Sequence, residues 1–123
     1  MCILIPKTCA GFVQCDGTDS AGKLISLEVN KEQCNLSLIG VYAPVASCVS
    51  EQLSFFQELR RVTLDRSIDM GIILCGDFNT HLCELGNNYL PNRANNFFRS
   101  LLDECNLVDV WRYLNRPMSA ADS

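Results

Sequence analysis

The residues best suited to chemistry lie in the stretch IILCGDFNT, residues 72–80. An apolar run ends at Gly76, which permits a tight backbone turn or the close approach of a ligand. A carboxylate at Asp77 can accept a proton from an attacking water or help to hold a divalent metal. A carboxamide at Asn79 can donate to a phosphate oxygen whose charge grows in the transition state. These residues also fit a plain turn, because Asp and Asn both favour turns.

A second candidate lies in LIGVYAP, residues 38–44. Tyr42 stands near the end of an expected strand, which Pro44 ends because proline cannot donate to the strand ladder. A tyrosine hydroxyl at a strand end can hydrogen-bond a phosphate. A lone tyrosine is more often a core aromatic with a paired hydroxyl. Tyr42 alone therefore leaves both interpretations open.

The first half of the chain is expected to form strands that position Tyr42. Short β-like runs are predicted at residues 2–5 and 12–15, and a turn rich in Gly, Asp and Ser covers 16–22. Alternating apolar and polar residues predict a half-buried strand over 24–29. After a polar loop, residues 35–42 are predicted to be the second strand of a hairpin.

The second half combines helices with an apolar strand that leads to Asp77. Ser50 is predicted to cap a first helix, because residues after it follow a helical period. The run 71–75 is typical of a strand buried on both faces, and a long loop over 80–93 precedes a second helix over about 94–105. Residues 107–111 are predicted to form a strand or a short buried segment. Hairpins interleaved with helices indicate an α/β or α+β layered domain.

Composition limits the class of protein. A chain of 123 residues fits one domain or part of one. The net charge of −4 weakly disfavours a nucleic-acid partner, because such domains usually carry a basic face. No stretch is long and apolar enough to span a membrane, and the N-terminal MCILIPK has its charge in the wrong place for a signal peptide. An intracellular location, nuclear or cytoplasmic, is expected.

The eight cysteines are spread along the chain without a C-x-x-C pair. This spacing disfavours a zinc site. Without a signal peptide, a disulfide framework is not expected either. Several cysteines stand in apolar runs, as Cys75 does. We therefore expect buried free thiols that act as small hydrophobes.

The two motifs together resemble the endonuclease/exonuclease/phosphatase family. The shared pattern is L-x-x-V-Y-A-P, a helix, and then I-I-L-x-G-D-F-N. Residues 101–117 (LLDECNLVDVWRYLNRP) are similar to the apurinic-type endonuclease domain of non-LTR (LINE-like) retrotransposons. The resemblance implies a four-layer αββα sandwich. Residues 1–123 would form its middle, a partial domain that lacks the N-terminal and C-terminal portions.

The resemblance implies roles for individual residues. Asp77 matches the family aspartate that orients or deprotonates the attacking water. Asn79 and Tyr42 match residues that contact the scissile phosphate, so all three are candidate catalytic residues. Asp109 matches a recurrent aspartate and is expected to make a structural hydrogen bond. Trp111 and Arg112 match the same segment and are expected to lie near the site. Trp111 is expected to pack there, and Arg112 to form a local ion pair.

The implied reaction is the attack of water on a phosphodiester of DNA, assisted by bound Mg²⁺. The family's principal metal-binding glutamate and its catalytic histidine match no residue here, so the metal ligands are unknown. The single histidine, His81, is expected to be a solvated loop residue and not a replacement. We expect this chain alone to be inactive and only marginally stable.

Two alternatives stay open. Because VYAP and GDFN do not determine the substrate, the chain also fits a phosphoinositide or phospholipid phosphoesterase of the same fold, which the acidic net charge mildly favours. A non-catalytic interaction module is the third possibility. The sequence does not determine the DNA target, the number of metal ions or the oligomeric state.

Overall fold

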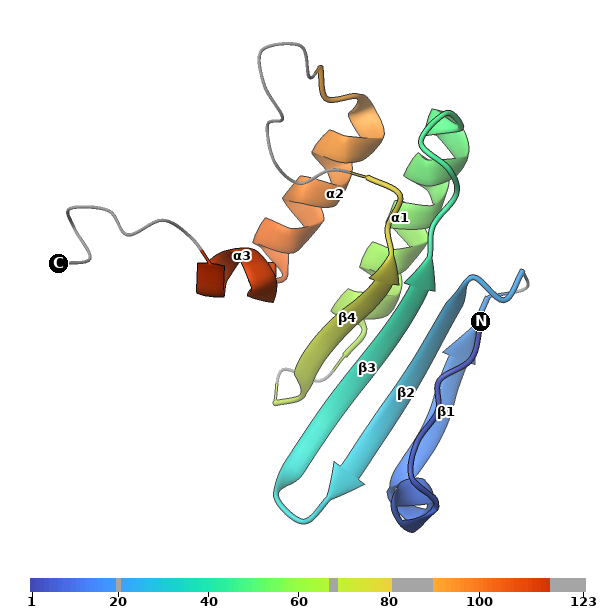
Figure 1. The fold of residues 1–123 in the computed structure, drawn as a ribbon, viewed down its shortest axis with the longest axis vertical. Helices are drawn as coiled ribbons and strands as arrows, with labels where there is room; N and C mark the ends of the chain where they lie inside the picture. Colours follow the sequence, from blue (N-terminus) through green and yellow to red (C-terminus); the bar gives the residue numbers. More distant parts are fainter. Residues whose placement is uncertain (20, 67–68, 81–89, 116–123) are drawn as a thin grey trace, which may run out of the picture.

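The computed structural model describes residues 1–19, 21–66, 69–80 and 90–115. These residues form a mixed α and β structure with one four-stranded sheet (Figure 1). The elements in chain order are η1 Lys7–Phe12, β1 Val13–Thr18, β2 Leu24–Lys31, β3 Cys34–Tyr42, α1 Val49–Leu64, β4 Gly71–Asp77, α2 Arg93–Glu104 and α3 Val110–Asn115.

The sheet is mixed, with the strand order β1-β2-β3-β4. The first two pairs of neighbours are antiparallel, whereas β3 and β4 are parallel. A parallel pair needs a crossover, which α1 supplies here. The crossover brings the carboxyl ends of β3 and β4 to the same edge of the sheet. Tyr42 and Asp77 are the last residues of these strands and stand opposite each other in register.

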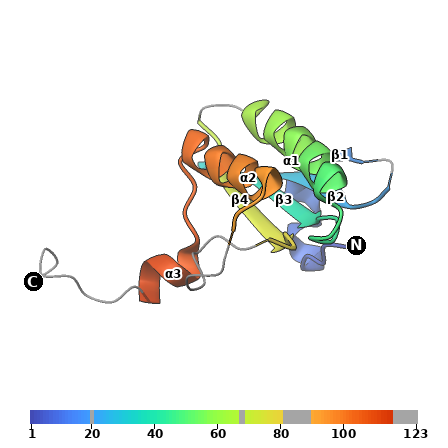
Figure 2. The ribbon, with the colours of Figure 1, turned by 90° about the horizontal axis from the view of Figure 1, so that it is seen from above.

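The core lies between the sheet and the helices α1 and α2, which cover the same face (Figure 2). Ile39 and Val41 point into this core from alternate positions of β3 and are almost completely buried. Phe98 of α2 stacks on Phe56 of α1, with ring centroids 4.7 Å apart. Phe98 also stacks on Phe78, at 4.9 Å. Phe78 thus anchors the segment after β4 to the core.

Both covering helices have local reasons to form. Buried side chains of α1 recur every three or four residues, as in Phe56, Leu59 and Thr63, which gives the helix one apolar face. The N-terminus of α2 carries a capping box between Asn92 and Asn95. Each side chain accepts a hydrogen bond from the other residue's backbone N–H, both at 2.9 Å. Two otherwise unpaired donors are satisfied in this way.

The opposite face of the sheet is open at β4, whereas over β2 and β3 it is partly covered and buries Leu27 and Gly40. Ile73 and Cys75 of β4 alternate with residues that face the helices, and both are exposed on the open side. The N-terminal segment crosses this face near β3. A Cβ atom built at Gly40 would lie 3.3 Å from Ile3 Cδ1 and 3.5 Å from Met1 Sδ. The sheet therefore has one packed face and one face with exposed apolar side chains.

Several sequence predictions are confirmed. The hairpin strands predicted over 24–29 and 35–42 correspond to β2 and β3, and the helix predicted over 94–105 corresponds to α2. The predicted hairpin loop is shorter than expected, because only residues 32 and 33 separate the strands.

Three local predictions are wrong. Residues 2–5 form no strand, because they lie across the sheet instead of pairing at its edge. Ser50 is not the N-cap of α1, since the helix begins at Val49 with Cys48 as its cap. Residues 107–111 form neither a strand nor a buried segment. They lead into the helix α3, where Trp111 is 71% exposed.

The predicted burial of β4 on both faces is also wrong, because Ile73 is 45% exposed. A continuous apolar run shows that a strand can be buried, but not that something covers each face. The described cysteines are free thiols, but the predicted burial is wrong, because none is fully buried and only Cys9, Cys48 and Cys105 are half-buried. Four are exposed: Cys2, Cys15, Cys34 and Cys75.

Some predictions fall outside the described residues. They concern His81 and Cys83, most of the loop predicted over 80–93, and the tail beyond Asn115. Among the helices that the structure describes, none is long and apolar enough to cross a membrane.

Candidate functional site

Polar side chains gather beside the carboxyl end of β4. A pocket of about 490 Å³ opens there. Its polar lining consists of Asp77, Asn79, Thr80, Asp109 and Arg112. Asp77 ends the strand, Asn79 and Thr80 follow it, and the last two come from the region where α3 begins. Tertiary folding therefore joins two sequence segments that lie about thirty residues apart.

Gly76 shapes the strand end that presents Asp77. Its φ of +135° is a conformation that L side chains rarely adopt. A Cβ atom at this position would lie only 2.0 Å from the carbonyl oxygen of Val41 in β3. Glycine at position 76 therefore allows the neighbouring strand β3, and not a ligand, to approach closely.

Asp77 combines a turn with an exposed carboxylate. Its Oδ1 accepts a hydrogen bond from the backbone N–H of Asn79, at 2.9 Å. This is an Asx-type turn of the kind that aspartate often makes. A carboxylate has about four acceptor sites. Asp77 can therefore hold the turn and still accept a proton or contact a cation.

Asn79 is held from two sides. It adopts a left-handed conformation with φ +47°, which asparagine tolerates better than most residues. Its Nδ2 donates to the carbonyl oxygen of Ala43, at 2.8 Å. A carboxamide carries two N–H donors. The contact to Ala43 uses one, so the other can donate to a ligand in the pocket.

Gln52 of α1 is a residue that sequence reasoning missed. Its side chain is completely buried, and its Nε2 donates to the carbonyl oxygens of Pro44 and Asn79, at 3.0 and 2.7 Å. These acceptors lie in the loops that follow β3 and β4. The available signal was a glutamine on the apolar face of an amphipathic helix, but this pattern does not identify its distant partners.

A further contact ties the site to α2. The side-chain amide of Asn95 donates to the hydroxyl of Thr80. Asn95 is also the third residue of α2 and a member of the capping box. The segment after β4 is thus connected to both helices that cover the sheet.

Asp109 contributes a second carboxylate to the pocket. Its Oδ1 accepts from the backbone N–H of Arg112 at 3.1 Å, the geometry of an N-cap for α3. Its Oδ2 lies 3.3 Å from Arg112 Nε, so the two side chains form an ion pair. Because guanidinium has five N–H donors, Arg112 keeps donors for an anionic ligand.

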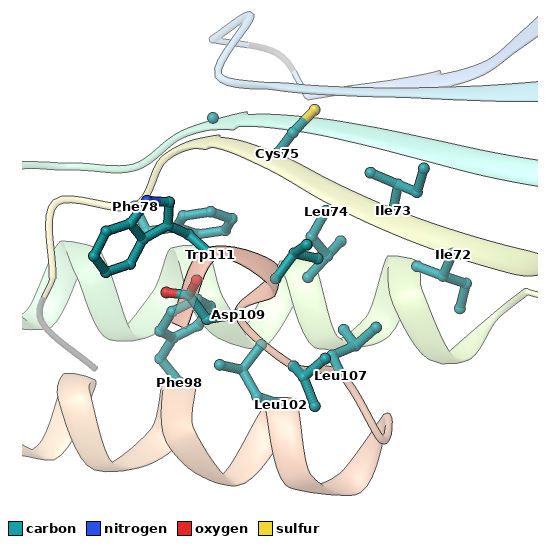
Figure 3. Close-up of a pocket in the computed structure, with 13 residues that line it drawn as sticks. Ile72, Ile73, Leu74, Cys75, Phe78, Phe98, Leu102, Leu107, Asp109 and Trp111 are labelled. Atoms are coloured by element: carbon teal, nitrogen blue, oxygen red, sulfur yellow. The ribbon is translucent and has the colours of Figure 1, made fainter. Parts of the chain in front are cut away.

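Trp111 and Tyr42 lie near this pocket without lining it. Trp111 borders a neighbouring apolar groove of about 490 Å³ between β4, α2 and residues 107–111 (Figure 3). Most of its side chain is exposed. Tyr42 is 52% exposed. Since Val41 faces the core, strand alternation directs the Tyr42 side chain to the open face of the sheet.

The donor set of the pocket suits a hard cation only in part. Asp77 and Asp109 supply carboxylate oxygens, the ligand type that Mg²⁺ prefers. Among the described ranges of the chain, no three His, Cys, Asp or Glu side chains come together as a metal site. The arrangement offers two candidate ligands for a largely hydrated ion.

Comparison with known proteins adds no family assignment. No protein-family model matches the chain. No curated protein matches it either. The chemistry of the site is therefore the available basis for a function.

Proposed function

We propose that this chain carries part of the active site of a magnesium-dependent phosphodiesterase of the endonuclease/exonuclease/phosphatase type, which nicks DNA as retrotransposon endonucleases do. One observation carries the proposal. Asp77, Asn79, Asp109 and Arg112 line one pocket at the carboxyl end of a parallel strand. Open α/β sheets bind ligands at such strand ends.

The proposed roles follow from the chemistry of each group. The Asp77 carboxylate orients the attacking water and accepts its proton. The second N–H of the Asn79 carboxamide donates to a phosphate oxygen as its charge increases. The guanidinium of Arg112 adds a positive charge and a forked donor geometry that fits phosphate. Tyr42, in register with Asp77 at the end of the adjacent strand, would offer its hydroxyl to the substrate backbone from outside the pocket.

Asp77 and Asp109 are the side chains that would hold Mg²⁺, because both are carboxylates that line the pocket. Proteins often bind Mg²⁺ through one or two carboxylates while the ion keeps several waters. The ion would polarise the phosphate when bound. Asp109 Oδ1 caps α3 and Oδ2 pairs with Arg112, so a metal ion would compete with this ion pair for Oδ2.

The proposal includes the fold. We propose that the four-stranded sheet is part of a four-layer αββα sandwich. Two features support this. The helices cover one face only, and Ile73 and Cys75 are exposed on the other. An apolar groove also runs beside the edge strand β4. Exposed apolar faces and unpaired strand edges are surfaces that further layers and strands normally cover.

The proposal is tested by titrating the isotope-labelled chain with Mg²⁺ and then with a short DNA duplex that contains an abasic site. We expect NMR shifts at Asp77, Asn79 and Arg112. Asp77→Asn should abolish the Mg²⁺ response, because it removes the charge while its Oδ1 can still accept from Asn79. The matched control is Asp103→Asn on the exposed side of α2. Shifts spread over the surface, or the same loss in both variants, would refute the proposal.

The same titration separates the two substrate classes. A soluble phosphoinositide that shifts these residues at lower concentration than DNA would favour the phosphoesterase alternative. Added Mg²⁺ and supercoiled plasmid provide a direct assay for nicking. We expect little nicking by these 123 residues alone, because the described part of the chain gathers no three metal-ligating side chains.

A non-catalytic interaction module is the second candidate, and one observation favours it. Four large apolar side chains of α3 are more than half exposed: Val110, Trp111, Tyr113 and Leu114. An apolar surface of this kind is suited to contact with another protein. Binding of a protein partner that Trp111→Ala abolishes and Asp77→Asn leaves intact would support this function over the first.

A further inference from the structure

Gln52 is a polar side chain in an apolar core. It lies in the first turn of α1 and faces the sheet together with Phe55 and Phe56. None of its surface is exposed. Burial of an amide without compensating hydrogen bonds costs free energy. The bonds that Gln52 makes therefore indicate why a glutamine can occupy this place.

Both bonds of Gln52 go to loops that border the candidate site. Its Nε2 donates to Pro44 O at 3.0 Å and to Asn79 O at 2.7 Å. Pro44 follows β3, whose last residue is Tyr42, and Asn79 follows β4, whose last residue is Asp77. A single side-chain nitrogen thus bridges the two segments that carry the candidate residues.

Asn79, which accepts a hydrogen bond from Gln52, is already constrained by other hydrogen bonds. Asn79 is left-handed, and its backbone N–H donates to Asp77 Oδ1. Its Nδ2 donates to Ala43, the neighbour of Pro44. Gln52 therefore closes a ring of hydrogen bonds that runs through Ala43, Asn79 and Pro44. A rotation of the Asn79 backbone would break the bond to Gln52 and would move the carboxylate of Asp77.

The side-chain oxygen of Gln52, Oε1, makes it possible to test positioning apart from simple stabilisation. Gln52 Oε1 is buried, and no described residue donates a hydrogen bond to it. An apolar side chain of similar length would remove this unpaired acceptor, which is a source of instability. Methionine at this position would therefore lack the unpaired acceptor as well as the two donor bonds.

We infer that Gln52 is a positioning residue that holds the loops after β3 and β4 together and so orients Asp77 and Asn79. The hydrogen-bonded bridge is a property of the fold. Its importance for catalysis rests on the proposed function. Loop order and ligand response can therefore be measured separately.

The first test uses the unaltered chain, so it does not depend on the folding of any variant. We expect the side-chain amide protons of Gln52 to show NMR cross-peaks to Pro44 and Asn79. They should also exchange with water at least about tenfold more slowly than those of Gln57, an exposed glutamine of the same helix. Equal exchange rates and absent cross-peaks would overturn the inference.

The second test compares Gln52→Met with Gln52→Glu. Methionine removes both donors without adding charge. We expect the thermal midpoint to change little, while the backbone amide of Asn79 exchanges about tenfold faster. A fall in thermal midpoint without faster exchange at Asn79 would indicate a purely structural role. Gln57→Met is the matched control and should change neither quantity.

Glutamate at position 52 adds a dependence on pH. An ionised carboxylate would face two carbonyl oxygens, so we expect fast exchange at Asn79 near neutral pH. Burial raises the pKa of a carboxyl. Acidification should therefore protonate it early, restore one donor and raise the protection of the Asn79 amide, measured as its exchange rate relative to the intrinsic rate at the same pH. Gln52→Met should show no such recovery. The same recovery in both variants would contradict the bridge.

Ligand response separates this inference from the proposed function. If Gln52→Met loosens Asn79 and weakens the Mg²⁺ response at Asp77, both stand. If Asn79 loosens but the unaltered chain shows no Mg²⁺ response, the proposed function fails and the bridge remains. An unchanged Mg²⁺ response in a variant whose Asn79 has loosened would overturn the positioning role.

Discussion

Gly76 and Val41 lie in backbone contact across the parallel pair β3 and β4, so close that a Cβ atom at position 76 would sit 2.0 Å from the Val41 carbonyl oxygen. The φ of +135° at Gly76 adds a second restriction. Asp77, the next residue, ends β4.

Replacement of this glycine should be severe. We expect Gly76→Ala to lower the free energy of unfolding by at least about 3 kcal/mol, because backbone strain and a clash add together. Chemical denaturation followed by circular dichroism measures this quantity. Gly22→Ala is the control, since Gly22 also has a positive φ (+68°) but open space around it. That change should cost about 1 kcal/mol. Equal losses would show that the contact with Val41 is unimportant.

Two neighbouring isoleucines test the one-sided packing of the sheet. Ile72 packs partly against the core beneath the helices, whereas Ile73 is on the open face. We expect Ile72→Thr to cost about 1 to 2 kcal/mol in stability. Ile73→Thr should change stability by less than about 0.5 kcal/mol.

A hydrophobic dye completes this test of the open face. The unaltered chain should bind such a dye, and Ile73→Thr should reduce the fluorescence more than Ile72→Thr. A cooperative melt without dye binding would contradict an open apolar face. It would also contradict the marginal stability expected for the chain.

Arg66 should contribute more to stability than an exposed arginine. Its side chain is only 9% exposed and forms ion pairs with Asp16 and Glu28. It connects the end of α1 with β1 and β2. We expect Arg66→Leu to cost about 2 kcal/mol, because it leaves partly buried carboxylates without a partner. Arg61→Leu is the control, since its pair with Glu58 is exposed. That change should cost less than about 1 kcal/mol. Similar losses in urea denaturation would contradict this prediction.

Cys105 should make stability decline at alkaline pH. Burial raises the pKa of its thiol above the ordinary value of 9.0, and the charge of Glu104 adds to this shift. The folded state therefore favours the protonated thiol. Below the ordinary pKa both states are protonated and nothing is lost. As pH rises through the raised pKa, the unfolded state gains the advantage of ionisation.

Cys105→Ala provides the measurement. The unaltered chain should lose more stability between neutral and alkaline pH than this variant, as urea midpoints would show. At neutral pH the Cys105 thiol should also react more slowly with iodoacetamide than the exposed thiol of Cys34. Equal reactivity of the two thiols would indicate that burial does not protect Cys105.

The sequence alone determined those parts of the chain that local patterns control. Alternation predicted the hairpin of β2 and β3, and helical spacing predicted α2, because such periodicity arises within one element. Asp77 and Asn79 were identifiable as candidates because a turn follows an apolar strand. The resemblance named Asp109, Trp111 and Arg112 as residues near the site.

Only the tertiary structure decided which of these residues line the same pocket. Asp109 and Arg112 line the same pocket as Asp77, while Tyr42 turns to the open face and Trp111 lies on a groove rim. The burial of each face of β4 and the partners of Gln52 depend on segments distant in sequence. A local pattern records that a side chain is apolar or polar, but the neighbour that covers it or pairs with it is chosen by folding.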